Sequence, residues 1–126
     1  MSSLDGERYV SLATFKKNGQ EVRTPVWFAA DPKQPKRLWV YTNINAGKVK
    51  RVRNNGRARV AACGAAGKLK GDFLDAKARM LQAGDESWQH GWDALHAKYW
   101  MLGVGMIFAR ISGRYAQRGL MAVDLV

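Results

Sequence analysis

Two short apolar runs on either side of an Asn-Gly dipeptide constrain the fold of this chain more than any other feature. Residues 9–15 and 21–30 are both rich in β-formers, which is typical of strands. Between them, Asn18 and Gly19 supply the dipeptide most typical of a tight hairpin turn. Pro25 lies inside the second run and has no backbone N–H to donate, so we expect an edge, a bulge or a break in the ladder there.

Two helices are predicted among the later strands. Residues 43–45 can cap a short helix over 46–54, and Asn55 followed by Gly56 is a stop signal. A second helix is expected from a cap at Asp85 or Ser87, because apolar side chains then recur every three or four residues. It should weaken at the glycines 103 and 105. The members of its apolar stripe are Trp88, Trp92, Leu95, Tyr99, Leu102 and Met106.

Further strands are expected over 37–42, 57–63, 72–82 and 120–126. The resulting order, β-β-β-α-β-β-α-β, combines antiparallel hairpins with two packing helices, and this favours a small barrel. We therefore predict a mainly β fold, a six-stranded antiparallel barrel. A chain of 126 residues suits a single domain over 1–126 that can bury its own core.

Three features predict a cytoplasmic protein. The single cysteine, Cys63, allows no internal disulfide. Residues 1–10 contain no apolar core of signal-peptide length. The longest uncharged apolar stretch, 99–109, is eleven residues long, whereas a bilayer span needs roughly 20.

The positive charge of the chain is concentrated in one window. The net charge is +11, and residues 32–71 hold eleven Lys and Arg side chains with no Asp or Glu, while the flanking segments are balanced. Such a localised field indicates an anionic partner, either a phosphate, a polycarboxylate, nucleic acid or an acidic membrane surface. A solubilising charged face is the alternative interpretation.

Within this window, residues 41–53 run from the end of a predicted strand into the start of the predicted helix. A helix N-terminus presents free N–H groups and partial positive charge, so it is a natural phosphate site. Thr42 can donate its hydroxyl and Lys48 can supply a full charge. On a helical wheel Lys48 flanks the buried side, and Arg51 points further out, toward solvent or a second anionic group. An ordinary solvated lysine is the alternative for Lys48.

Five segments of the chain have the order and spacing that are typical of a known family. They are residues 9–15, the Asn-Gly turn, and residues 23–28, 41–43 and 47–51. Together they resemble the pyridoxamine 5′-phosphate oxidase-like split β-barrels, in particular the branch that uses the deazaflavin coenzyme F-420. The resemblance covers residues 8–82 clearly and extends more weakly to the final strand. It implies a split barrel of the FMN-binding type and a homodimer whose cofactor lies between the subunits.

The resemblance also implies a cofactor-binding set. Lys48, preceded by Gly47, corresponds to the lysine that contacts the cofactor phosphate. Thr42, next to Asn43, corresponds to the hydroxyl residue at the end of the preceding strand. Arg51 would lie near the phosphate or near the polyglutamate tail of a deazaflavin. The strand that lines the cofactor ring would contribute Thr24, Pro25, Val26 and Trp27.

The chain departs from the oxidase members of this family at the phosphate motif. They carry Ser-Arg-Lys where this chain has Ala46, Gly47 and Lys48, so one hydroxyl and one cation are missing. Their substrate-binding residues also find no match near the C-terminal end, so pyridoxamine phosphate oxidation is not predicted. We expect an oxidoreductase that binds coenzyme F-420, favoured by the acid-free basic window, or FMN. The cofactor would exchange hydride with a small organic substrate, and no catalytic side chain is assigned.

Three other functions remain open. One is a flavin- or deazaflavin-binding protein without turnover. Another is a basic nucleic-acid-binding barrel, for which a pI near 10.2 is the expected footprint. The third is peripheral membrane contact through residues 99–109. No metal site is expected, because His90 and His96 are the only histidines and no Cys/His cluster accompanies them.

Overall fold

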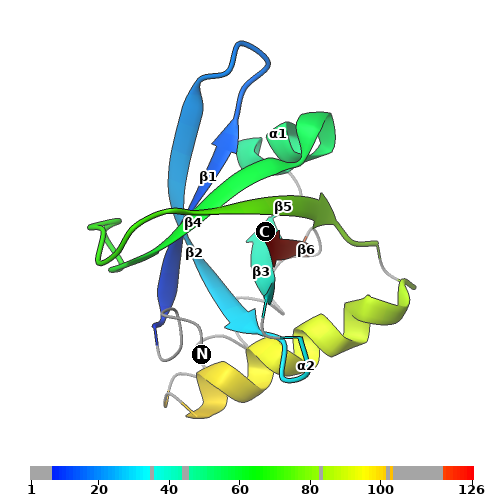
Figure 1. The fold of residues 1–126 in the computed structure, drawn as a ribbon. Coiled ribbons are helices and arrows are strands. Elements are labelled where there is room, and N and C mark those ends of the chain that lie inside the picture. Colours follow the sequence, from blue (N-terminus) through cyan, green and yellow to red (C-terminus); the bar gives the residue numbers. More distant parts are fainter. Residues whose placement is uncertain (1–6, 35, 44–45, 83, 102, 104–117) are drawn as a thin grey trace.

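A computed structural model describes residues 7–34, 36–43, 46–82, 84–101, 103 and 118–126 (Figure 1). The order of strands and helices in this part is the predicted one. The elements are β1 Tyr9–Phe15, β2 Glu21–Ala30, β3 Arg37–Asn43, α1 Gly47–Asn55, β4 Arg57–Cys63, β5 Leu74–Met80, α2 Glu86–Met101 and β6 Arg118–Leu125.

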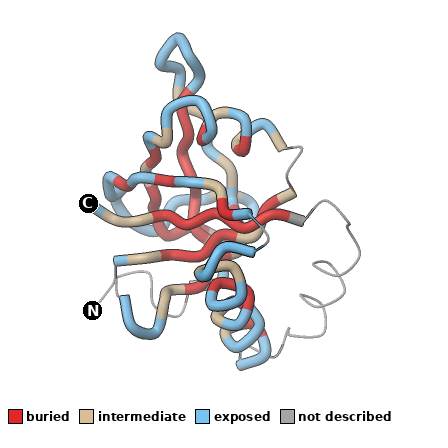
Figure 2. The backbone as a smooth tube through the Cα atoms, turned by 90° about the vertical axis from the view of Figure 1, so that its right-hand side faces the viewer, coloured by how far each residue is buried: buried red, intermediate tan, exposed pale blue. Residues whose placement is uncertain are grey.

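The six strands form a closed antiparallel barrel in the order β1-β2-β3-β6-β5-β4. Leu12 of β1, for example, lies opposite Thr24 of β2 on one side and Val60 of β4 on the other. Alternate side chains of each strand point inward and form one buried apolar cluster. Figure 2 shows these buried stretches passing through the middle of the molecule. The predicted mainly β, six-stranded barrel is confirmed.

Strands β2 and β3 pair along only a short part of their length. These strands pair only from Phe28 opposite Val40 to Ala30 opposite Leu38. Within the described residues, the earlier part of β2 pairs with β1 alone, and Pro25 lies there, opposite Ser11. A residue without an N–H is tolerated where the strand has one neighbour. Of the three alternatives predicted for Pro25, the structure shows an edge, because the ladder with β1 continues through this residue.

Two predicted turn signals are confirmed in detail. Gly19 adopts a φ of 88° and donates its N–H to the Lys16 carbonyl at 2.9 Å, closing the β1–β2 hairpin. Gly56 ends α1 with a φ of 70° and donates to the Val52 carbonyl at 2.9 Å. Glycine adopts this left-handed conformation at no steric cost, so both turns follow directly from the sequence.

Helix α2 packs on the outside of β2, β3 and β6 (Figure 1). Three members of its predicted stripe are buried, with Trp92 at 5% and both Leu95 and Tyr99 at 0% exposure, while Trp88 is half-buried. These side chains form a second apolar cluster with Trp39 of β3. The helix ends at Met101 and is followed by a glycine at 103 with a φ of 78°. The last two predicted members, Leu102 and Met106, lie outside the described residues.

Some predicted boundaries differ from the structure. The cap residue of α1 is Ala46, which makes no side-chain cap hydrogen bond, and not one of the predicted residues 43–45. Asn43 contributes its backbone instead, because its carbonyl accepts the Ala46 N–H at 2.9 Å. Strand β5 is shorter than the predicted 72–82, and β6 begins earlier than predicted.

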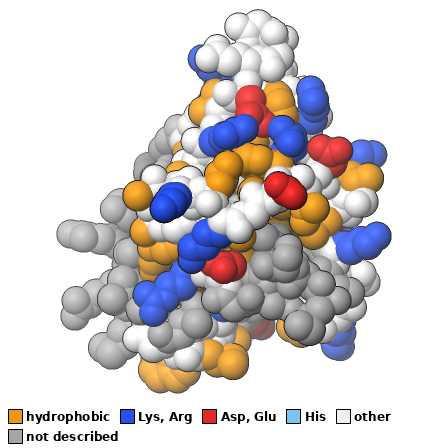
Figure 3. Space-filling view, turned by 60° about the vertical axis from the view of Figure 1, so that its left-hand side comes forward, with side chains coloured by type: hydrophobic (Ala, Val, Ile, Leu, Met, Phe, Trp, Pro, Cys, Tyr) orange, Lys and Arg blue, Asp and Glu red, His pale blue; other side chains and the backbone are white. Residues whose placement is uncertain are grey.

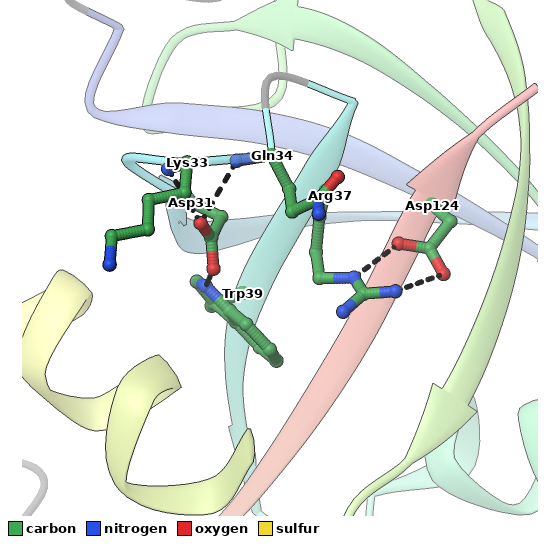
Figure 4. A network of polar contacts seen from close by, with 6 residues as sticks. All are labelled: Asp31, Lys33, Gln34, Arg37, Trp39 and Asp124. Atoms are coloured by element: carbon green, nitrogen blue, oxygen red, sulfur yellow. Dashed lines mark hydrogen bonds and ion pairs between the residues drawn. The ribbon is translucent and has the colours of Figure 1, made fainter.

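One carboxylate organises the loop between β2 and β3 (Figure 4). Asp31 accepts the backbone N–H of Lys33 at 2.8 Å and the indole N–H of Trp39 at 3.1 Å. Arg37, at the start of β3, forms an ion pair with Asp124 of β6 at 2.7 Å. Charged side chains in this loop and at the start of β3 thus help to hold the barrel together.

None of the helices among the described residues is long and apolar enough to cross a membrane.

Candidate functional site

Helix α1 lies against β1 and β5 with one apolar side. Val49 and Val52 are 1% and 4% exposed, and Val52 belongs to the barrel cluster. Residues three apart lie on the same side of a helix. The opposite side of α1, which carries the exposed Lys50 and Arg53, therefore faces away from the core.

The start of α1 is positively charged and holds no acidic residue. Its first turn contains no Asp or Glu, and the cap supplies no side-chain acceptor. The free N–H groups of such a turn carry about half a positive charge. Lys48 adds a full charge and is half-buried; burial, and then the nearby Arg51 guanidinium, lower its pKa below the usual range. This arrangement favours an anionic ligand.

Arg51 folds back toward the start of the helix. Its Nε donates a hydrogen bond of 2.6 Å to Oγ1 of Thr14, a fully buried residue of β1. A Cβ atom at Gly47 would lie 2.9 Å from Arg51 Nη1, so the guanidinium lies against the bare backbone of that glycine. The expectation that Arg51 points further out is therefore wrong. Helical side chains tilt toward the N-terminus, which lets a residue reach the one four positions before it.

A hollow of about 570 Å³ adjoins this helix start. It lies between α1 and the turn end of the β1–β2 hairpin, and five of its lining residues are Lys or Arg. No acidic residue lines it within the described part of the chain. The lining consists of Phe15, Lys16, Lys17, Gly47, Lys50, Arg51, Arg53 and Asn54. Because Gly47 and Arg51 belong to both, the hollow and the helix start form one continuous cationic site.

Some cations elsewhere on the barrel have acidic partners, namely Arg23, Arg37, Arg59 and Lys70. Glu21, for example, pairs with Arg59 at 3.2 Å and with Arg23 at 3.0 Å. On the face seen in Figure 3, acidic side chains are interspersed among the basic ones. In contrast, none of the four Lys and Arg residues of α1 forms an ion pair with a described acidic residue. Other cations, such as Lys77 and Arg79 of β5, also lack an ion pair with a described acidic residue, but α1 carries four such cations within its nine residues.

The residues predicted to line the cofactor ring lie where β2 has β1 as its only described strand partner. Thr24 is half-buried and Pro25 is exposed. Val26 lies in the barrel core at 4% exposure, so its side chain packs within the protein. Trp27 is half-buried and stacks on Tyr99 of α2, with 4.5 Å between ring centroids and 23° between planes.

The end of β3 lies directly beside the start of α1. Thr42 is 2% exposed, and its hydroxyl donates to the Asn43 carbonyl at 3.3 Å. That carbonyl also accepts the N–H of the cap residue Ala46. Thr42 and Asn43 thus lie next to the start of α1, but the Thr42 hydroxyl donates to a backbone carbonyl of the protein.

The sequence analysis missed the contribution of the β1–β2 hairpin. Lys16 and Lys17 line the hollow, and Thr14 holds Arg51. The hairpin reaches α1 through long-range contacts, including a 3.3 Å hydrogen bond from the Asn55 amide to the Phe15 carbonyl. The two lysines before the Asn-Gly turn were visible in the sequence, but they indicate only a local positive charge and not that the hairpin lies beside α1.

Several solved structures share this fold over almost the whole chain. The heme storage protein HutZ from Vibrio cholerae has a TM-score of 0.68 and 14% identity, covering 96% of this chain and 83% of its own. A FAD-binding protein from Mesorhizobium loti has a TM-score of 0.64 and 18% identity, with 97% and 82% covered. A putative pyridoxamine 5′-phosphate oxidase from Listeria innocua has a TM-score of 0.61 and 13% identity, with 97% and 86% covered. At these identities the likeness shows the fold alone.

The family is shown by sequence. A search of curated proteins found no match. The model of the family Pyridoxamine 5′-phosphate oxidase, however, matches residues 2–123, which is nearly the whole chain. The six-stranded antiparallel barrel with two helices is consistent with the split-barrel fold expected from the resemblance. The chain therefore belongs to the pyridoxamine 5′-phosphate oxidase family.

Proposed function

We propose that this protein binds a flavin-type cofactor by its phosphate at the start of α1 and acts as an oxidoreductase. One observation carries the proposal: Lys48, the Arg51 guanidinium and the acid-free first turn of α1 place three sources of positive charge together. Like charges at close range disfavour one another, and a bound phosphate relieves this repulsion. Family membership and the fold shared with a FAD-binding protein support a flavin over other phosphate-bearing ligands.

We favour the deazaflavin coenzyme F-420 over FMN because of the hollow beside the helix start. Lys16, Lys17, Lys50 and Arg53 lie there, in addition to the cations needed for one phosphate. The polyglutamate tail of F-420 carries carboxylates beyond its phosphate, whereas FMN does not. A cationic hollow with no acidic lining residue in the described chain stabilises such a tail through charge-assisted hydrogen bonds.

In this proposal the residues of the chain bind and orient the ligand. Lys48 and Arg51 hold the phosphate, and the edge of β2 near Pro25, which has no β3 partner among the described residues, offers backbone groups to the ring. Trp27 is fixed by stacking on Tyr99, which keeps this edge in place. The cofactor supplies hydride transfer to or from a small organic substrate.

The resemblance extends this proposal to a homodimer whose second subunit closes the cofactor groove. Sedimentation equilibrium tests it directly. We expect a species of about twice the 14.1 kDa of one chain, at concentrations where the cofactor is bound. A monomer that binds the cofactor as tightly at all concentrations contradicts the shared groove.

A binding protein without turnover is the second candidate. The departures from the oxidase motif at Ala46 and Gly47, where a hydroxyl and a cation are missing, keep it open. The two functions differ in the fate of the reduced cofactor. An oxidoreductase accelerates its oxidation by a quinone or nitroaromatic acceptor, whereas a carrier leaves the rate unchanged or slows it.

The test of binding is a fluorescence titration of the purified protein with F-420, with FMN and with single-stranded DNA, at low and at moderate salt. Saturable binding of F-420, tighter than that of FMN, supports the proposal. Tighter binding of FMN would replace the favoured cofactor. If neither cofactor binds and DNA binds with a steep salt dependence, the cationic site serves nucleic acid and the proposal is wrong.

A further inference from the structure

The side chain of Arg51 is held at two points before any ligand binds. Its Nε donates to Oγ1 of the fully buried Thr14 at 2.6 Å. Its Nη1 lies against Gly47, where a Cβ atom would approach within 2.9 Å. That separation is too short for a real Cβ, so a side chain at residue 47 would force the end of the guanidinium to shift from its observed position.

This position is electrostatically unfavourable in the protein alone. The guanidinium lies at the positive end of α1 and close enough to Lys48 to oppose its charge. An arginine on an exposed helix has many other rotamers available, and no described acidic residue pairs with this one. Thr14 and the bare backbone of Gly47 therefore hold a cation where repulsion would otherwise displace it.

We propose that Thr14 and Gly47 are positioning residues that fix Arg51 as an anion clamp at the border between the helix start and the hollow. The inference rests on the proposed phosphate site and names the residues that decide its affinity. Because Nε is occupied by Thr14, the two terminal nitrogens of Arg51 are left to bind paired oxygens of a phosphate. Gly47 stands where the oxidase members of the family carry an arginine. Arg51, one helical turn later, thus supplies the missing cation.

Three single variants test the clamp, with F-420, FMN and inorganic pyrophosphate as probes. Arg51→Ala should weaken binding of the bound probe by about tenfold or more, because a charge-assisted contact is lost. Thr14→Val, which keeps the side-chain shape, and Gly47→Ala, which displaces the guanidinium, should each weaken it by about three- to tenfold. The matched control is Lys68→Ala. Lys68 is exposed and follows the Cys63 end of β4, whereas α1 lies next to the opposite end of that strand, at Arg57.

Two further readouts separate positioning from a general structural role. Alanine is a better helix former than glycine, so Gly47→Ala should bind the probe more weakly without a lower Tm. The double variant Thr14→Val/Arg51→Ala should bind no more weakly than Arg51→Ala, because Thr14 acts only through Arg51. Additive losses, or wild-type affinity in Gly47→Ala, would overturn the clamp.

The side-chain Nε–H signal of Arg51 in ¹⁵N NMR provides a readout without any ligand. We expect a slowly exchanging signal in the wild type, missing in Thr14→Val and shifted by pyrophosphate. If pyrophosphate binds and shifts this signal while neither cofactor binds, the clamp holds and the proposed function fails. If a cofactor binds equally well to wild type and Thr14→Val, the proposed function holds and the clamp is overturned. Absence of the wild-type signal also overturns the clamp.

Discussion

Replacing Tyr99 with phenylalanine tests how α2 is attached to the barrel and to the β2 edge. Tyr99 is completely buried. Its hydroxyl accepts the backbone N–H of Phe28 at 2.9 Å and donates to the Arg8 carbonyl at 2.7 Å, with the Phe28 carbonyl also within 3.1 Å. One hydroxyl therefore joins α2 to the start of β1 and to the middle of β2.

The expected loss follows from what Tyr99→Phe leaves behind. The ring and its stacking on Trp27 remain, but the Phe28 N–H loses this acceptor. A buried donor left without a partner costs about 1–3 kcal/mol, and the carbonyls that lose a donor add less. We expect the free energy of unfolding to fall by about 1–3 kcal/mol.

Urea denaturation followed by tryptophan fluorescence measures this loss. Tyr9→Phe is the matched control, because its ring packs edge-on against the same Trp27 at 6.2 Å, while the structure shows no hydrogen bond from its hydroxyl to a described residue. The control should change stability by less than about 0.5 kcal/mol. Equal effects of the two substitutions would refute the attachment through Tyr99.

The pH dependence gives Tyr99 a second signature. Burial raises the pKa of its hydroxyl above the ordinary 10.0 of tyrosine. A raised pKa in the folded state means that this stability is fully present below pH 10.0 and is lost as the pH rises through the folded value. Tyr99→Phe should therefore lose less stability than the wild type at alkaline pH.

Three further results are expected. Burial lowers the pKa of Lys48, so as the pH is raised this lysine should lose its charge, and the protein its cofactor affinity, before pH 10.5, the usual pKa of lysine. Lys48→Arg should keep the affinity over the same pH range, and cofactor titrations at a series of pH values measure the difference. Gly56→Ala should cost about 1–2 kcal/mol in urea denaturation, because φ is 70° and the new Cβ would lie 3.0 Å from the Ala78 carbonyl oxygen. Cys63 is 1% exposed and burial raises its pKa, so DTNB should modify it at least about tenfold more slowly in the native protein than in urea.

Local signals were sufficient to predict the barrel. The Asn-Gly turn, the stop at Gly56 and the edge position of Pro25 each depend on the conformation or the missing N–H of one or two residues, so they can be predicted without the tertiary structure. The buried stripe of α2 follows from helical spacing in the same way. The cap at Ala46 could not be predicted, because alanine has no side-chain acceptor and therefore gives no capping signal in the sequence.

The candidate site could be predicted only in part. Lys48 and the charged window were visible because they are consecutive in the chain. The turned-back Arg51 depends on Thr14, which lies 37 residues earlier and reaches the helix through the folded barrel. Lys16 and Lys17 join the site for the same reason. Long-range packing of the hairpin against α1, which no local pattern encodes, decides these contacts.

The central claim is that a flavin-type cofactor is held by its phosphate at Lys48. The most direct test is a fluorescence titration of wild type, Lys48→Ala and the control Lys68→Ala with F-420 and with FMN. Loss of one charge-assisted phosphate contact costs about 1.5–3 kcal/mol, so Lys48→Ala should bind about ten- to a hundredfold more weakly, and the control should match the wild type. Unchanged cofactor affinity in Lys48→Ala, or no saturable binding by the wild type, would contradict the claim.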